Sequence, residues 1–289
     1  MNEHHHQGYD VQALWEVNED NEEGFENRCE EVHCPSLSLL KQEEIIKKLV
    51  NSYDYVSARE VCGMLPESAT AAYRPWLDLA CARLRLDFVE MNRLDRELNS
   101  GCIPLKAKGK QEYFEYALNL AVKQKKEEYT DFIRAITPLM VDLFALILKH
   151  ECDIDITKYL TDKKWDEEKL KRENAGVDAC LNRAYRGNFR YGDVYSVHLV
   201  QIIKKYSKNE KLIALAAELR KIEEKVRNPA AHEIVSMSEE RIKKMTGGKD
   251  TEDIMGLLRN AFKYTGIGIR SEDWDSYERM NEKILQRMQ

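Results

Sequence analysis

The sequence predicts an all-α protein, and three observations support that fold class. Helix-favouring residues such as Leu, Ala, Glu, Lys and Arg are abundant, whereas Gly (13) and Pro (6) are scarce in the 289 residues. From Ser36 onward, apolar residues recur at three- and four-residue spacing, which is the period of an amphipathic helix. A hydrophobic content of 43% is enough for a sizeable core.

The first 35 residues differ from the rest of the chain. Tyr9–Val17 (YDVQALWEV) has the composition of a single strand, and an acidic stretch from Glu19 to Glu31 follows it. Cys34 and Pro35 then mark a break. We expect residues 1–35 to be an N-terminal tail or the remnant of a preceding domain.

Residues 36–105 are expected to form a smaller helical linker region. Apolar spacing predicts one helix from Ser36, a short second helix over Tyr53–Leu65, and a long third helix over Thr70–Leu98. The stretch Gly101–Gly109 contains Pro104 and no apolar periodicity, so a domain boundary is expected within it.

Residues 106–289 are expected to form a larger helical bundle. Periodicity and end signals predict helices over Lys110–Lys126, Glu127–Glu151, Val194–Tyr206, Glu210–Arg227, Ser238–Met245, Asp250–Tyr264 and Glu272–Met288. Pro138 should kink or divide the second of them, because proline removes a helical hydrogen bond. Ser238 and Ser271 are expected N-caps, and Gly247-Gly248 is an expected stop.

Charge, cysteines and hydropathy limit the classes of function. A net charge of −6 is a poor footprint for a nucleic-acid binder, so any RNA contact must come from a local basic patch. The seven cysteines show no CxxC spacing and no secretory leader is evident, which favours reduced thiols in the cytoplasm and predicts no metal site and no cofactor. No apolar run approaches the roughly 18 residues of a membrane span, so no membrane partner is expected.

The segment most informative about chemistry is Arg227-Asn228-Pro229-Ala230-Ala231-His232 (RNPAAH), directly after an amphipathic helix. Asn228 can cap a new helix and Pro229 suits its first position, so a bend is expected after Arg227, with His232 one turn on. On one straight helix, side chains five residues apart lie roughly 140° apart. A kink can bring Arg227 and His232 together, or a second protomer can supply the missing partner.

These residue types suit RNA cleavage that needs no metal ion. Histidine titrates near neutrality and can remove the proton of a ribose 2′-hydroxyl or protonate the leaving 5′ oxygen. Arginine is always charged and matches the geometry of phosphate, and Asn228 can orient either residue. Glu223, one turn before Arg227, can hold its guanidinium. Spacing alone is a weak signal, because Arg-x4-His often arises by chance.

The RNPAAH segment in an all-α chain resembles the Arg-x4–6-His motif of HEPN ribonucleases, in which Asn directly after the Arg is typical. Three further stretches resemble the ancillary ribonucleases of type III CRISPR systems, of the Csm kind: Leu39–Glu60, Thr137–Lys149 and Asp275–Leu285. The resemblance implies a HEPN domain over residues 106–289, with Arg227, Asn228 and His232 as catalytic residues in a composite homodimer site. It further implies cleavage of single-stranded RNA in antiviral defence.

Full-length members of that family begin with a sensor domain that binds a cyclic oligoadenylate. Only about 35 residues precede the helical part here and no Gly-rich phosphate loop is present, so we expect the ring to be a partner only where a sensor domain is present. Arg183, Arg186 and Arg190 are interleaved with aromatic residues and are candidates for RNA binding; a packed loop with surface arginines is the simpler interpretation. The alternative function is a HEPN-like module that binds RNA or nucleotide without cutting it, or a helical scaffold.

Overall fold

A computed structural model describes the backbone of residues 12–19, 26–33, 35–232 and 237–288, with side chains from Ser38 to Val226 and from Met237 to Met288. The chain forms two compact units. The first contains residues 1–100 together with 278–289, and the second contains residues 101–277. Helices dominate both units, so the all-α fold class is confirmed. The assignment of residues 36–105 as a linker and 106–289 as a HEPN domain stays a prediction.

Two strands form an antiparallel hairpin near the N-terminus. Strand β1 (Gln12–Glu19) pairs with β2 (Glu26–His33), and the register runs from Gln12 opposite His33 to Glu19 opposite Glu26. The predicted strand over residues 9–17 corresponds to β1, although residues 9–11 lie outside the described residues. Strand β2 was not predicted, because its sequence ENRCEEVH is dominated by charge and lacks an apolar run.

The first unit is a series of short helices that pack on their neighbours. These helices are α1 (Pro35–Asn51), α2 (Tyr55–Gly63), α3 (Glu67–Thr70), α4 (Arg74–Leu84) and α5 (Phe88–Leu98). Contacts join α1 to α2, α2 to α4, and α4 to α5. Each pair buries apolar side chains such as Ile46, Trp76 and Met91.

Helix α13 (Ser276–Gln286), from Glu278 onward, completes this first unit. The Asn281 amide donates to the Val50 carbonyl at 3.0 Å, and its oxygen accepts from the Tyr55 hydroxyl at 2.7 Å. The guanidinium carbon of Arg287 lies 3.9 Å from the centre of the Trp76 ring. Residues far apart in the sequence therefore share one core.

The prediction of a single helix over residues 70–98 was wrong. Leu86 adopts a left-handed backbone conformation (φ 56°), which ends α4. Asp87 then caps α5 by accepting a hydrogen bond from the Glu90 backbone N–H at 3.1 Å. Apolar spacing continues through this corner, so the helical period alone could not reveal the turn. The pattern Asp-x-x-Glu at residues 87–90 was the available signal.

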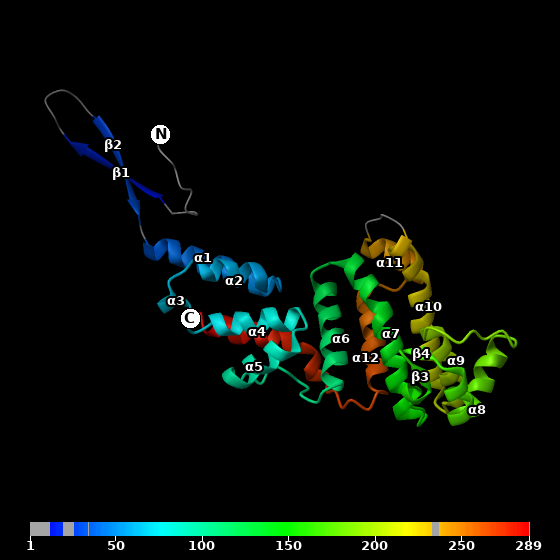
Figure 1. The fold of residues 1–289 in the computed structure, drawn as a ribbon. Coiled ribbons are helices and arrows are strands. Elements are labelled where there is room, and N and C mark those ends of the chain that lie inside the picture. The colour runs from blue at the N-terminus through cyan, green and yellow to red at the C-terminus, as the bar shows by residue number, and fades with distance from the viewer. Residues whose placement is uncertain (1–11, 20–25, 34, 233–236, 289) are drawn as a thin grey trace, which may run out of the picture. The chain divides into compact units, whose positions relative to one another are not determined.

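The second unit is built around α7 (Tyr129–Glu151), which contacts α6, α9, α10 and α12; α6, α7 and α12 lie side by side in Figure 1. Buried side chains along α7 include Phe132, Ile136, Phe144 and Leu148. The other elements are α6 (Lys110–Lys125), η1 (Ile156–Tyr159), β3 (Leu160–Thr161), β4 (Lys164–Trp165), α8 (Glu167–Ala184), α9 (Ser196–Tyr206), α10 (Glu210–His232), α11 (Glu239–Thr246), α12 (Thr251–Phe262) and η2 (Ser271–Asp275).

Pro138 does not divide α7, which continues as one helix on both sides of it. The interruption lies instead in α8, at Asn174 (φ −154°, ψ 78°). The Asn174 side chain accepts from the Val177 N–H at 3.1 Å and donates to the Tyr159 hydroxyl at 3.0 Å, so it restarts the helix. Buried apolar contacts on both sides of Pro138 hold α7 in register, which outweighs the lost hydrogen bond.

The predicted helix ends were confirmed in two places and wrong in one. Ser238 caps α11 by accepting from the Arg241 N–H, and Gly247 ends that helix in a left-handed conformation (φ 82°). Ser271 is not an N-cap, because η2 begins there and Arg270 precedes it.

The described residues include five cysteines, and all five are free thiols. Cys62, Cys81 and Cys102 are buried. Burial raises the pKa of the Cys81 thiol to about 11, which agrees with a small, unreactive core residue. Within the described part of the chain, no helix combines the length and apolar character needed to cross a membrane.

Candidate functional site

The predicted catalytic segment lies at the end of α10, which runs without a break from Glu210 to His232. The expected bend after Arg227, with Asn228 capping a new helix, was therefore wrong. Upstream of the segment, α10 contacts α7 and α9 and buries an apolar face, and this packing favours continuation of the helix. The side chains of Arg227, Asn228 and His232 lie outside the described residues.

A continuous helix has a consequence for the predicted site. At about 100° per residue, the five steps from Arg227 to His232 place them roughly 140° apart around the helix axis. The backbone therefore puts the two residues on different faces of α10. The sequence left two arrangements open. The continuous helix disfavours a local kink and favours a site completed by a second copy of the chain.

A buried polar cluster lies one turn before this segment. Glu223 is only 2% exposed and accepts a hydrogen bond from the Ser196 hydroxyl. The Arg220 guanidinium lies 3.5 Å from the same carboxylate. Because Ser196 opens α9, this cluster fastens the start of α9 to α10. The predicted pairing of Glu223 with Arg227 is untested, since the Arg227 side chain is not described.

His198, predicted to be a core residue, is buried as expected. Its Nδ1 accepts a hydrogen bond from the Trp165 indole N–H at 3.0 Å, and the Tyr195 backbone N–H lies 3.3 Å away. Burial, with a smaller contribution from the nearby Arg220, lowers the pKa of His198 to about 4. The neutral imidazole, with its proton on Nε2, is therefore the form present at pH 7, and it serves packing rather than acid–base chemistry.

The candidate RNA-binding arginines, Arg183, Arg186 and Arg190, are all exposed. No carboxylate forms an ion pair with any of the three among the described residues. Arg183 lies in the last turn of α8, while Arg186 has a left-handed backbone (φ 55°) that turns the chain back. They are available to phosphate, and RNA binding by them stays a prediction.

The aromatic residues of the same segment are more buried than its arginines. Phe189 is buried, and its ring centre lies 5.2 Å from that of His198. The Tyr185 ring lies 5.6 Å from His198, and the Tyr191 hydroxyl donates to Asp178. The idea that these rings stack bases is therefore not supported for Phe189. The simpler interpretation, a packed loop with surface arginines, describes its geometry.

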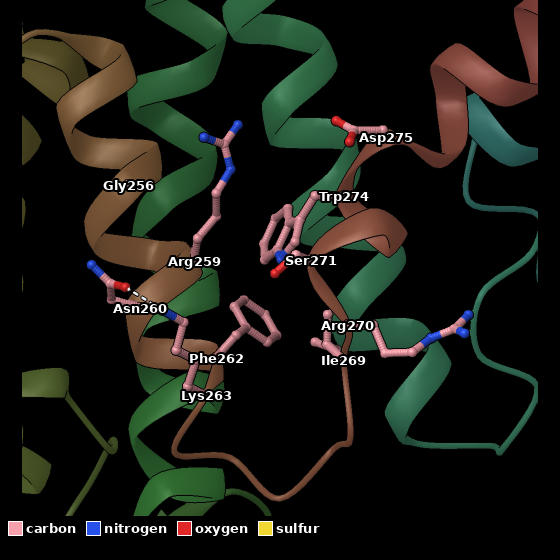
Figure 2. A pocket seen from close by; sticks show the side chains of 10 residues that line it. All are labelled: Gly256, Arg259, Asn260, Phe262, Lys263, Ile269, Arg270, Ser271, Trp274 and Asp275. Carbon is pink, nitrogen blue, oxygen red and sulfur yellow. Dashed lines mark hydrogen bonds between the residues drawn. The ribbon is translucent and has the colours of Figure 1, made fainter.

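A cavity of about 450 Å³ lies between α12 and η2, and the sequence interpretation missed it. Figure 2 shows the Trp274 and Phe262 rings beside it, with Asn260 and Lys263 on the α12 side. Its walls are formed by Gly256, Arg259, Asn260, Phe262, Lys263, Ile269, Arg270, Ser271, Trp274 and Asp275. The residues come from two segments separated by a turn, so only the fold assembles them. A tryptophan among charged residues at 271–275 (SEDWD) was the available signal.

Candidate metal ligands do not gather in the described part of the chain. Within it, no group of three or more His, Cys, Asp and Glu side chains has an arrangement suited to a metal ion.

Comparisons with known proteins place this helical chain in context. Residues 102–285 match the family model described as the Cas_Csm6 HEPN domain. The chain is 28% identical over 284 residues to the CRISPR system endoribonuclease Csm6 of Mycobacterium tuberculosis strain H37Rv, covering 97% of this chain and 63% of that protein.

The fold is similar to that of Enterococcus italicus Csm6 bound to cyclic hexa-2′-fluoro-hexa-dAMP, with a TM-score of 0.68 and 12% sequence identity. That match covers 90% of this chain and 60% of the Enterococcus chain. The chain thus spans about three fifths of the length of both relatives.

Proposed function

Because the chain belongs to the Cas_Csm6 HEPN domain family, we propose that it is an endoribonuclease that cuts single-stranded RNA in type III CRISPR antiviral defence, in the cytoplasm. The observation that carries the proposal is the family match over residues 102–285, which includes the RNPAAH segment at the end of α10. The relative from Mycobacterium tuberculosis, named as an endoribonuclease, supports the same class of activity.

The proposed reaction uses the 2′-hydroxyl of the substrate as the nucleophile. His232 removes the hydroxyl proton as the oxygen attacks phosphorus, and Arg227 stabilises the charge that builds on the phosphoryl oxygens. The bond from phosphorus to the 5′ oxygen then breaks, and that oxygen takes up a proton from a general acid. Asn228 orients one of these groups or bonds a phosphoryl oxygen. The products are a 2′,3′-cyclic phosphate and a 5′-hydroxyl.

The separation of Arg227 and His232 around α10 supports a site shared by two copies of the chain. With one residue on each face, a single helix offers the substrate only one of them at a time. A twofold axis beside the ends of two α10 helices brings two arginines and two histidines together. One histidine then acts as the base and the other as the acid.

The decisive experiment is cleavage of a labelled single-stranded RNA by the purified protein with excess EDTA. We expect cleavage to persist and the product ends to be cyclic phosphate and 5′-hydroxyl. A matched substrate with a single 2′-deoxy residue at the cut position should stay intact, because it lacks the nucleophile. Strict Mg²⁺ dependence, or cutting of the deoxy substrate, would contradict the mechanism.

The shared site predicts that activity follows dimer formation. Sedimentation velocity across a dilution series gives the fraction of dimer, and cleavage at the same concentrations gives the activity per chain. We expect the two to fall together on dilution. Full activity in a sample that sediments as a monomer would contradict the composite site while leaving the ribonuclease assignment intact.

Regulation by a cyclic oligoadenylate is proposed only for a chain that carries a sensor domain. The Enterococcus italicus relative is bound to a cyclic hexanucleotide analogue. In the described residues of this chain, both sheets are two-stranded and antiparallel, whereas a βαβ unit needs about 30 residues and a crossover helix. Calorimetry with a cyclic tetra- or hexa-adenylate and the 289-residue chain should show no submicromolar binding.

A further inference from the structure

We propose that the cavity between α12 and η2 binds one nucleotide unit of single-stranded RNA, with the base against Trp274 and the phosphate at Lys263. The cavity lies wholly within the second unit and is separate in sequence from the RNPAAH segment. Its volume of about 450 Å³ falls within the range of small-ligand sites, roughly 300–1,000 Å³. The space suits a single nucleotide and excludes a duplex.

The aromatic wall of the cavity is fixed in orientation before any ligand arrives. The Trp274 indole meets the Phe114 ring edge-on at 4.9 Å between centres and the Phe262 ring at 5.5 Å. Phe114 and Phe262 are buried, whereas Trp274 is half-buried and lines the cavity. A preoriented indole is a suitable platform for stacking, and stacking tolerates any base because every base has a π-face.

Arg259 is placed to close over a stacked base. Its guanidinium carbon lies 5.8 Å from the centre of the Trp274 ring. This separation is larger than the distance of about 4 Å in a direct stacked contact, and smaller than the roughly 7 Å that a base between the two groups needs. Glu252 anchors one end of the guanidinium at 2.6 Å. The Arg259 Nε is shielded from solvent and has no hydrogen-bond acceptor. An outward shift of the guanidinium would allow this donor to form a hydrogen bond.

Lys263 supplies the cation for the phosphate. It is exposed, and its ammonium donates to the Asn260 amide oxygen at 2.9 Å. Among the described residues it has no carboxylate partner. Arg270, by contrast, is held by Asp273 at 3.1 Å, and in Figure 2 its guanidinium points away from Trp274.

The remaining wall residues set the orientation of the ligand. Asp275 carries a negative charge on the cavity wall, so a second phosphate is disfavoured there, while its oxygens can accept from the amino group of a base. The Ser271 hydroxyl offers a further donor and acceptor. Opposite charges at Lys263 and Asp275 therefore favour the phosphate on the α12 side and the base on the η2 side.

The choice of RNA as the ligand rests on the proposed ribonuclease function, so the test measures binding of a strand that cannot be cut. Anisotropy of a fluorescent 2′-O-methyl hexanucleotide gives its affinity for the full chain. Lys263→Glu should weaken binding at least about tenfold, whereas Lys158→Glu, an exposed lysine elsewhere in the second unit, should change it less than twofold. Trp274→Leu should weaken binding roughly 5- to 100-fold, and Trp274→Phe less.

A photo-crosslink tests placement directly and does not depend on how well each variant folds. A strand with 5-iodouracil should give an adduct that mass spectrometry maps to Trp274 or Phe262. Adducts confined to residues 183–191, or equal binding by Lys263→Glu and Lys158→Glu, would overturn the proposal.

Competition separates the sources of the nucleotide. Displacement of the strand by a nucleoside 5′-monophosphate at matching affinity would assign the cavity to free nucleotides and overturn the RNA assignment. Equal displacement by inorganic phosphate would show that no base is recognised. Strand binding here by a protein that never cuts RNA contradicts the proposed function and supports the cavity. Normal cutting with unchanged binding in the Lys263 and Trp274 variants contradicts the cavity alone.

Discussion

Two regions of the second unit combine aromatic rings with cationic side chains, and they do so in opposite ways. In the segment from Arg183 to Tyr191, the arginines are exposed while Phe189 is buried beside His198. In the cavity between α12 and η2, Trp274 and Lys263 line the same space. Interleaved arginine and aromatic residues in a sequence therefore do not define a stacking surface. The backbone decides whether rings and charges share a face.

The same contrast separates two histidines. His198 lies on an apolar helix face, is buried, and is held neutral by its surroundings. His232 is the last residue of α10, and its side chain lies outside the described residues. A histidine suited to acid–base catalysis must exchange protons near neutrality, and His198 has lost that capacity. We therefore expect chemistry from His232 and stability from His198.

The largest expected effect on RNA cleavage comes from replacing His232, with a replacement of His198 as the control. His232→Ala should reduce RNA cleavage by 10²- to 10⁴-fold, because a general acid–base group is removed. The matched control, His198→Asn, keeps an acceptor for the Trp165 indole and should stay within about threefold of the wild type. Initial rates on a labelled RNA, with circular dichroism to confirm folding, check both. Near-wild-type cleavage by His232→Ala would show that the catalytic assignment is wrong.

A smaller effect concerns pH and sharpens the assignment of His198. Its pKa is about 4 in the folded protein and about 6.5 when unfolded, so between these values the unfolded chain holds more protons. Stability from this group is therefore fully present above pH 6.5 and falls as the pH drops toward 4. The decrease from pH 7 to pH 5 should be about 2 kcal/mol.

Urea unfolding of the wild type and of His198→Asn at pH 7 and pH 5 measures that contribution. The variant should lose less stability than the wild type on acidification, by about the same 2 kcal/mol. Equal losses in the two proteins would show that folding does not lower the pKa of His198. The comparison cancels the titration of other groups, because they are shared.

The smallest effect is expected at the exposed arginines. Replacing Arg183, Arg186 and Arg190 together by Gln removes three candidate phosphate contacts. The slope of log affinity against log salt should then fall by about 2, at roughly 0.7 per contact for a single strand. Lys158→Gln is the control for loss of one surface charge. An unchanged salt slope in the triple variant would remove this segment from the RNA-binding surface.

Much of the fold followed from the helical period, and the errors fall where local backbone chemistry overrides it. The period identified α7 and α10 because their apolar faces pack in the core. It missed the corner at Leu86, where a left-handed residue and the Asp87 cap separate two helices. The expected cap at Asn228 and helix start at Pro229 were also wrong, since α10 continues past this proline.

The candidate site was predictable only where a short motif carries it. RNPAAH is contiguous, so the sequence shows it directly, although the bend expected after Arg227 was wrong because α10 continues to His232. The cavity joins Lys263 on α12 to Trp274 on η2 across a turn, and Phe114 from α6 orients the indole. No linear pattern links these three residues. A site assembled by tertiary contacts becomes visible only when the fold is known.

The part of α13 from Glu278 onward has a consequence for how the protein is made. The ribosome synthesises α1 and α2 well before α13, yet the buried Tyr55 hydroxyl and Val50 carbonyl both bond to Asn281, about 225 residues later. Until that stretch emerges, these polar groups lack Asn281 and the apolar surface around them is uncovered. The second unit, which is continuous in sequence, can finish folding earlier. The nascent chain therefore completes the unit that contains α1 and α2 only after α13 has been made.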